Sequence, residues 1–137
     1  MRAVLDPNVL IAALLSPGGA PARTLVAWRA GRFELFASPG LLGELERALA
    51  YPKLRHRIPA ADAGAFTALL ARDATIAADI PDPPARASDS GDDYLIALAA
   101  DRRAVLVTGD GALLALAGSY PVFTPAAFLG WLDAPRG

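Results

Sequence analysis

The 137-residue sequence contains no cysteine, which excludes disulfide bonds, thiolate metal sites and a cysteine nucleophile. It also lacks any run of 18 or more apolar residues, so we expect no transmembrane helix. An excess of basic charge is missing too, because the formal net charge is -1 and the pI is about 5.7. Any nucleic-acid binding must therefore use a local basic patch, since no global positive field attracts a polyanion.

The composition that remains is typical of a globular protein, with 54% hydrophobic and 20% charged residues. The length suits one domain with one core, so we expect a single domain over residues 1–137. The first 15 residues superficially resemble a signal peptide, but Asp6, Pro7 and Asn8 interrupt the apolar region. We therefore expect a soluble, cytoplasmic protein.

Short apolar runs alternate with helical patterns along the chain. The clearest strands are Ala3–Leu5 and Ala104–Val107, and weaker ones are predicted at Phe33–Ala37, Thr75–Ala78 and Val122–Phe123. Helices are predicted at Val9–Leu15, Ala20–Ala30, Pro39–Ala50, Ala60–Arg72, Asp92–Arg103, Gly111–Ala117 and from Thr124 to about Leu132. This order predicts a three-layer α/β/α fold with a five-stranded parallel sheet.

Acidic residues stand where the predicted strands end. Asp6 and Asp110 lie at strand-to-helix junctions, Asp92–Asp93 opens the helix before the Ala104–Val107 strand, and Glu44 lies about one turn into the helix after the second strand. In a doubly wound sheet these positions fall at one edge, the edge where ligands bind. Taken singly, each acid has an ordinary structural explanation as a helix cap or a solvated helix flank.

Taken together, the acids predict a cation site, because clustered carboxylates repel one another unless a cation or protons are present. With no cysteine, and with His56 far from the group, the expected cation is Mg²⁺ or Mn²⁺. Such a site positions water and neutralises a phosphoryl group, which is the chemistry of phosphodiester hydrolysis. Helical periodicity places Glu44 and Glu46 at equal offsets from the apolar stripe of their helix, and it cannot choose between them.

Four stretches resemble the PIN-domain family, the metal-dependent ribonuclease fold found in VapC-type toxins of toxin–antitoxin pairs. They are Val4–Leu10, Phe36–Leu45, Asp92–Ala99 and Leu106–Asp110, and with their flanking helices they cover essentially the whole chain. The resemblance implies that the catalytic and metal-binding acids are Asp6, Glu44, Asp93 and Asp110, with Glu44 as a ligand or a general base. It further implies secondary roles for Asn8, Asp92, Asp89 and Thr108, of which Asn8 braces the metal-site loop and Thr108 brings a hydroxyl near the metal.

The resemblance implies an Mg²⁺- or Mn²⁺-dependent endoribonuclease, with RNA as substrate and an antitoxin protein as partner. The only dense basic tract, and so the candidate RNA contact, is Lys53, Arg55, His56 and Arg57; similar candidates are Arg23, Arg29 and Arg32. Apolar residues around Leu14, Leu15 and Trp28 could supply a homodimer or antitoxin surface, or could equally be core.

Three alternatives compete with this hypothesis. A receiver-like phosphoacceptor domain would need a lysine after its last strand, but the only lysine is Lys53, in the first half of the chain. A non-catalytic PIN-like binding module is favoured by Pro7, which stands where the family usually has a threonine or serine hydroxyl. A nuclease of the same fold outside any toxin pair, acting in RNA maturation or decay, fits the same residues.

Overall fold

A five-stranded, fully parallel sheet forms the centre of the protein in the computed structural model, which describes residues 1–85 and 90–135. Its strands are β1 (Arg2–Leu5), β2 (Glu34–Ala37), β3 (Thr75–Ile76), β4 (Val105–Val107) and β5 (Val122–Phe123), in the order β3-β2-β1-β4-β5. The central strand β1 pairs with β2 on one side and with β4 on the other. The predicted five-stranded parallel sheet is therefore confirmed.

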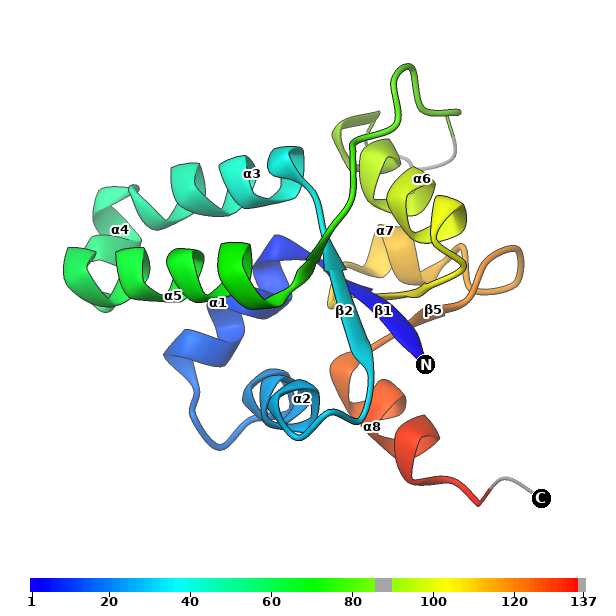
Figure 1. Ribbon diagram of the computed structural model, residues 1–137, viewed down its shortest axis with the longest axis horizontal. Helices are drawn as coiled ribbons and strands as arrows, with labels where there is room; N and C mark the ends of the chain where they lie inside the picture. Colours follow the sequence, from blue (N-terminus) through cyan, green and yellow to red (C-terminus); the bar gives the residue numbers. More distant parts are fainter. Residues whose placement is uncertain (86–89, 136–137) are drawn as a thin grey trace.

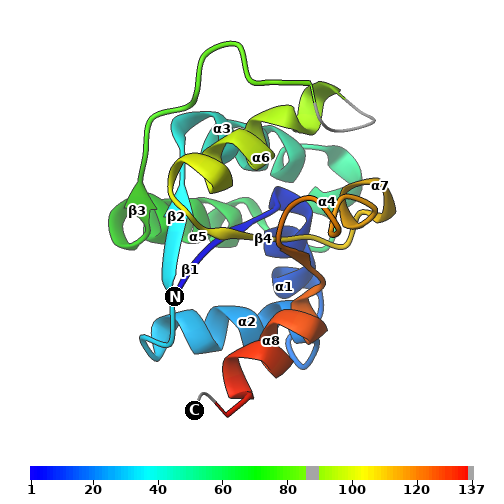
Figure 2. The same ribbon diagram turned by 90° about the vertical axis from the view of Figure 1, so that its right-hand side faces the viewer.

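Helices cover both faces of this sheet, as predicted. They are α1 (Pro7–Leu15), α2 (Ala20–Arg29), α3 (Pro39–Leu49), α4 (Pro52–Arg55), α5 (Ala60–Asp73), α6 (Asp93–Asp101), α7 (Gly111–Leu114) and α8 (Pro125–Asp133), and one 3₁₀ turn, η1 (Ser90–Asp92), precedes α6. Helices α3 and α6 lie on one side of the sheet, and α2 and α8 lie on the other (Figure 2). Helices α3, α4 and α5 form an arm that extends away from the strands (Figure 1).

The core lies on both faces of β1 and β4. Ala3, Val4 and Leu5 are fully buried, as are Leu106 and Val107. This explains why these strands read as continuous apolar runs, because a parallel strand covered by helices on both faces has no solvent-facing side. Of the apolar residues named as a possible interface, Trp28 belongs to the core, while Leu14 and Leu15 pack against the core and stay partly exposed.

Helix starts follow the capping residues in the sequence. The Ser38 hydroxyl accepts a hydrogen bond from the Leu41 amide (3.1 Å), and Pro39 occupies the first turn of α3. The Thr124 hydroxyl caps α8 in the same way, through the Ala127 amide (3.1 Å). The predicted starts of both helices are confirmed.

Several helices differ from the prediction, and α7 ends at Leu114, three residues before the predicted Ala117. The basic tract begins within a helical turn, α4, because Pro52 presets the helical φ of the first residue after extended Tyr51. Helix α6 ends at Asp101, before the predicted Arg103, which adopts a left-handed φ of 52°. The Ala104 amide then bonds to the Ala99 carbonyl (2.8 Å), the contact that closes a Schellman-type helix end.

No single helix of the described residues is long and apolar enough to cross a membrane. Helices α1 and α2 together reach that length and composition, but they are bent by 101° at the break between them.

Candidate metal centre

Asp6 and Asp110 meet at one edge of the sheet because β1 and β4 are neighbouring parallel strands. Leu5 is in register with Val107, and the Asp6 amide donates to the Val107 carbonyl (3.0 Å). Asp6 therefore follows β1 directly, while Asp110 follows β4 after a two-residue turn, Thr108–Gly109. Helices α1 and α7 begin at this edge (Figure 2).

The Thr108 hydroxyl connects these two acids. It donates to Asp6 Oδ2 (2.7 Å) and accepts from the Asp110 amide (3.0 Å), and the threonine is completely buried. The remaining Asp6 oxygen, Oδ1, accepts a hydrogen bond from the backbone N–H of Asn8 (3.0 Å). Thr108 therefore orients the Asp6 carboxylate and fixes the turn that carries Asp110.

Both acids also cap helices. Asp6 is the N-cap of α1, and Asp110 caps α7 by accepting from the Ala112 amide (2.9 Å) through Oδ1. The interpretation of these two acids as helix caps is therefore confirmed. It does not account for the burial of Asp6, which is only 5% exposed, because a cap needs a single acceptor at a helix end and that end is ordinarily near solvent.

Asp93 reaches the same edge from helix α6, which packs against both β1 and β4. It is the first residue of that helix and is only 4% exposed. The N-cap position belongs instead to Asp92, whose side chain makes no capping hydrogen bond. Asp93 is therefore a buried carboxylate at the edge and not the cap of its helix. Asp89 lies outside the described residues.

Glu44 approaches from helix α3 and is held by Tyr94, the residue that follows Asp93. The Tyr94 hydroxyl donates a hydrogen bond to Glu44 Oε2 across 50 positions of sequence. Burial raises the pKa of the Tyr94 hydroxyl, and so do the hydrogen bond to Glu44 and the negative charges of Glu44, Asp6 and Asp92. The phenol therefore lies among acids from three different elements.

Glu46 lies at a different part of the surface from Glu44. It lines a separate cavity between α3, α4 and α5, together with Arg55 and Thr67. Of the two glutamates on α3, only Glu44 contacts a residue of α6 within the described chain.

The electrostatics of Asp6 suit a bound cation. Within the described residues Asp6 takes part in no ion pair, and its two partners, the Asn8 amide and the Thr108 hydroxyl, are neutral donors. A buried carboxylate with neutral partners and acidic neighbours is costly unless a cation or a proton compensates it. The donors at this edge are carboxylate oxygens, the ligand type that Mg²⁺ and Mn²⁺ prefer.

The side chains as placed do not yet form a closed ligand set. Within residues 1–85 and 90–135, no three His, Asp or Glu side chains converge closely enough to hold a metal ion. Asp6 and Asp110 instead direct oxygens at backbone amides and the Thr108 hydroxyl. The donor chemistry and the backbone positions of these acids nevertheless fit a divalent cation.

A groove of about 540 Å³ opens beside Glu44, and its lining includes residues that sequence reasoning missed. Tyr94 and Arg47 line it, as does Asp79, which accepts from the Gly40 amide (2.7 Å) at the start of α3. A hydroxyl at the start of an otherwise apolar helix was the one available signal for Tyr94. Nothing in the sequence pattern links Asp79 to a helix 39 residues earlier.

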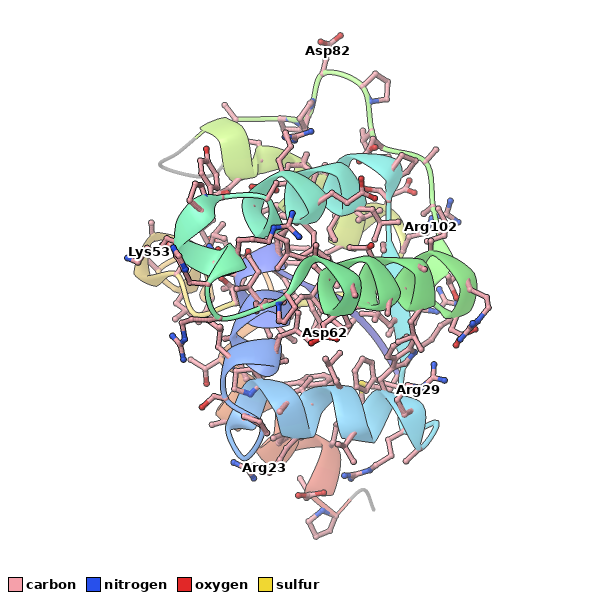
Figure 3. The ribbon with its side chains drawn as sticks, turned by 90° about the vertical axis from the view of Figure 1, so that its left-hand side faces the viewer. Arg23, Arg29, Lys53, Asp62, Asp82 and Arg102 are labelled. Carbon is pink, nitrogen blue, oxygen red and sulfur yellow. The ribbon has the colours of Figure 1, made fainter. Side chains whose placement is uncertain are left out.

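The predicted RNA-contact residues lie away from this groove. They are exposed on α4 and the turn after it, next to the C-terminal end of α3 (Figure 1), and comprise Lys53, Arg55, His56 and Arg57. Of the groove-lining residues described, Arg47 is the basic one. Among the other candidates, Arg29 pairs with Asp73 (2.9 Å) and Arg32 with Asp133 (2.6 Å). Figure 3 shows Arg23, Arg29 and Lys53 spread over the surface.

Comparison with known proteins supports the family suggested by the motifs. A family model described as PIN domain matches residues 2–112 of the 137, a stretch that includes Asp6, Glu44, Asp93 and Asp110. No curated protein matches the sequence significantly. PIN domains are generally nucleases and typically use divalent metals. The chain belongs to the PIN-domain family.

Proposed function

We propose that this protein is a metal-dependent endoribonuclease that hydrolyses RNA phosphodiester bonds. The observation that supports this best is the buried Asp6 carboxylate, which has only neutral partners and lies at the edge reached by Asp110, Asp93 and Glu44. Asp6, Asp93 and Asp110 would hold Mg²⁺ or Mn²⁺, and Glu44 would act as a further ligand or as a general base.

Each residue has a defined task in that mechanism. A bound divalent cation supplies charge neutralisation at the phosphoryl group and activates water. Thr108 holds Asp6 and the Asp110 turn, so that both carboxylates keep their places at the edge. Glu44, if it acts as the base, accepts a proton from the attacking water.

We further propose that the protein is the toxin of a type II toxin–antitoxin pair, acting in the cytoplasm and inhibited by an antitoxin protein. The resemblance of the four motifs to VapC-type toxins supports this role. A small antitoxin-like reading frame directly upstream of the gene is the simplest test. Its absence would favour a PIN nuclease of RNA maturation or decay.

The cleavage assay compares wild type, Asp110→Asn and Asp62→Asn on a mixed RNA pool, with Mg²⁺, with Mn²⁺ or with EDTA. Asp62 is exposed on α5, remote from the acidic edge, and serves as the charge-matched control (Figure 3). We expect wild type and Asp62→Asn to cleave with either ion, and Asp110→Asn to lose at least about 100-fold in rate.

The same assay separates the alternative of a non-catalytic binding module. The observation that favours this alternative is Pro7, a buried residue without a side-chain hydroxyl next to Asp6. RNA binding by wild type without cleavage under any divalent cation would establish the binding module and refute the enzyme.

A further inference from the structure

Tyr94 links the two helices that carry Glu44 and Asp93. Its side chain is partly buried. Its hydroxyl donates a hydrogen bond from α6 to Glu44 Oε2 on α3. Within the described chain Tyr94 is the only hydrogen-bond partner of the Glu44 carboxylate, and Oε1 makes no hydrogen bond. Arg47, one helical turn beyond Glu44, lines the same groove but forms no ion pair with it among these residues.

We propose that Tyr94 is a positioning residue for the hydrolysis, which holds Glu44 by Oε2 and leaves Oε1 to act at the metal edge. This inference rests on the proposed nuclease function. A glutamate has three side-chain torsions, and fixing such a chain costs rotamer entropy. A donor that fixes the carboxylate in the resting protein removes this cost from the reaction, which is the benefit of preorganisation.

A second tyrosine donates its hydroxyl to a backbone acceptor and offers a comparison. The Tyr120 hydroxyl donates to the Ala104 carbonyl (2.8 Å), a fixed backbone acceptor just before β4. Tyr94 instead donates to a long, ionisable side chain at the mouth of a groove. Tyr120→Phe is therefore the matched control, because it removes one partly buried hydroxyl without touching the acidic edge.

The experiment measures RNA cleavage by wild type, Tyr94→Phe, Glu44→Gln, the double variant and Tyr120→Phe, with Mn²⁺ saturating. We expect Tyr94→Phe to lower kcat by roughly 10- to 100-fold with KM for RNA unchanged, since its ring is kept and only the positioning is lost. In the Glu44→Gln background the same change should have no further effect, because Tyr94 acts through Glu44. Tyr120→Phe should cleave at the wild-type rate.

Three results would overturn the inference, and they differ from one another. If wild type cleaves and Tyr94→Phe cleaves as fast, the positioning role is refuted while the nuclease stands. An equal loss in both backgrounds would show that the hydroxyl matters only to structure. If wild type cleaves no RNA with any divalent cation, the proposed function fails, and the inference fails with it. If Glu44→Gln cleaves too slowly to assay, the effect of Tyr94→Phe is compared in the wild-type and Glu44→Gln backgrounds by Mn²⁺ binding. The quantity measured is the Mn²⁺ concentration that gives half of the maximal increase in Tm.

Discussion

Replacing Asp6 with asparagine tests the metal site without knowledge of the RNA target. We expect wild type to gain stability with Mn²⁺, because a ligand that binds only the folded state stabilises it. Without metal, Asp6→Asn should be as stable as wild type or more stable. The carboxamide still accepts from the Asn8 amide at the N-cap, a position that asparagine suits, and the buried negative charge is gone.

The expected changes in stability follow from binding linkage for Mn²⁺ and from the two hydrogen bonds of the Asp6 side chain for the variant. At 100 times its dissociation constant, Mn²⁺ adds about 2.7 kcal/mol to the free energy of unfolding. With an unfolding entropy of roughly 2.1 cal/mol/K per residue, a 137-residue domain then gains roughly 9 °C in Tm. In Asp6→Asn the amide group turns an N–H toward the Thr108 hydroxyl, and the buried O–H of Thr108 then loses its acceptor. This costs about 1–3 kcal/mol, and the removal of the buried charge offsets it.

The assay is thermal unfolding across an Mn²⁺ titration, with Asp62→Asn as the control for removing one acid from the surface. Wild type and Asp62→Asn should shift together, while Asp6→Asn should shift by a small fraction of that amount. A wild-type Tm that is unchanged at millimolar Mn²⁺ would refute the cation site. Equal shifts in wild type and Asp6→Asn would show that Mn²⁺ binds elsewhere.

Three further predictions concern the stability of the fold. Phe128→Ala should lower the free energy of unfolding in urea by about 3–5 kcal/mol, because the ring is fully buried and packs edge-on to Phe33 at 5.0 Å; a loss below about 1 kcal/mol would contradict this packing. Gly40→Ala should destabilise by about 1 kcal/mol, because its Cβ would lie 2.8 Å from Asp79 Oδ1 and displace that cap, and should become neutral or stabilising in an Asp79→Ala background. Asp73→Asn should be less stable than wild type at pH 7, because hydrogen bonds from the Arg72 and then the Arg29 side chain lower the pKa of Asp73 to about 2; thermal scans should show this difference shrinking as the pH falls below about 4 and vanishing only below about 2, where wild-type Asp73 becomes protonated in both states.

Much of the architecture is predictable from sequence because burial on two faces leaves a plain signal. The strands β1 and β4 consist of apolar residues alone from Ala3 to Leu5 and from Val105 to Val107, and each leads toward an acid. The order of strands and helices then places Asp6 and Asp110 at one edge without any knowledge of distances. Placement of the acids at the sheet edge thus follows from chain topology.

Contacts between side chains were beyond the sequence because they depend on packing between distant segments. The offsets of Glu44 and Glu46 about their helix are equal, and the neighbour that distinguishes them is Tyr94, 50 positions later. The same holds for the Asp79 carboxylate at the Gly40 amide. Helix α4 was missed because a basic tract after a tyrosine–proline pair reads as a break, while Pro52 in fact begins a new turn.

Pro7 stands where the resemblance leads one to expect a hydroxyl, and Thr108 bears directly on the absence of that hydroxyl. Pro7 starts α1 and is buried, so a serine or threonine there would bring a hydroxyl close to Asp6. The Thr108 hydroxyl already contacts Asp6 Oδ2 from the neighbouring strand end. If this contact replaces the missing one, Thr108→Val should reduce the Mn²⁺-induced Tm shift and the cleavage rate together, whereas Pro7→Thr should leave both unchanged. A gain of activity in Pro7→Thr would instead show that the proline limits the enzyme.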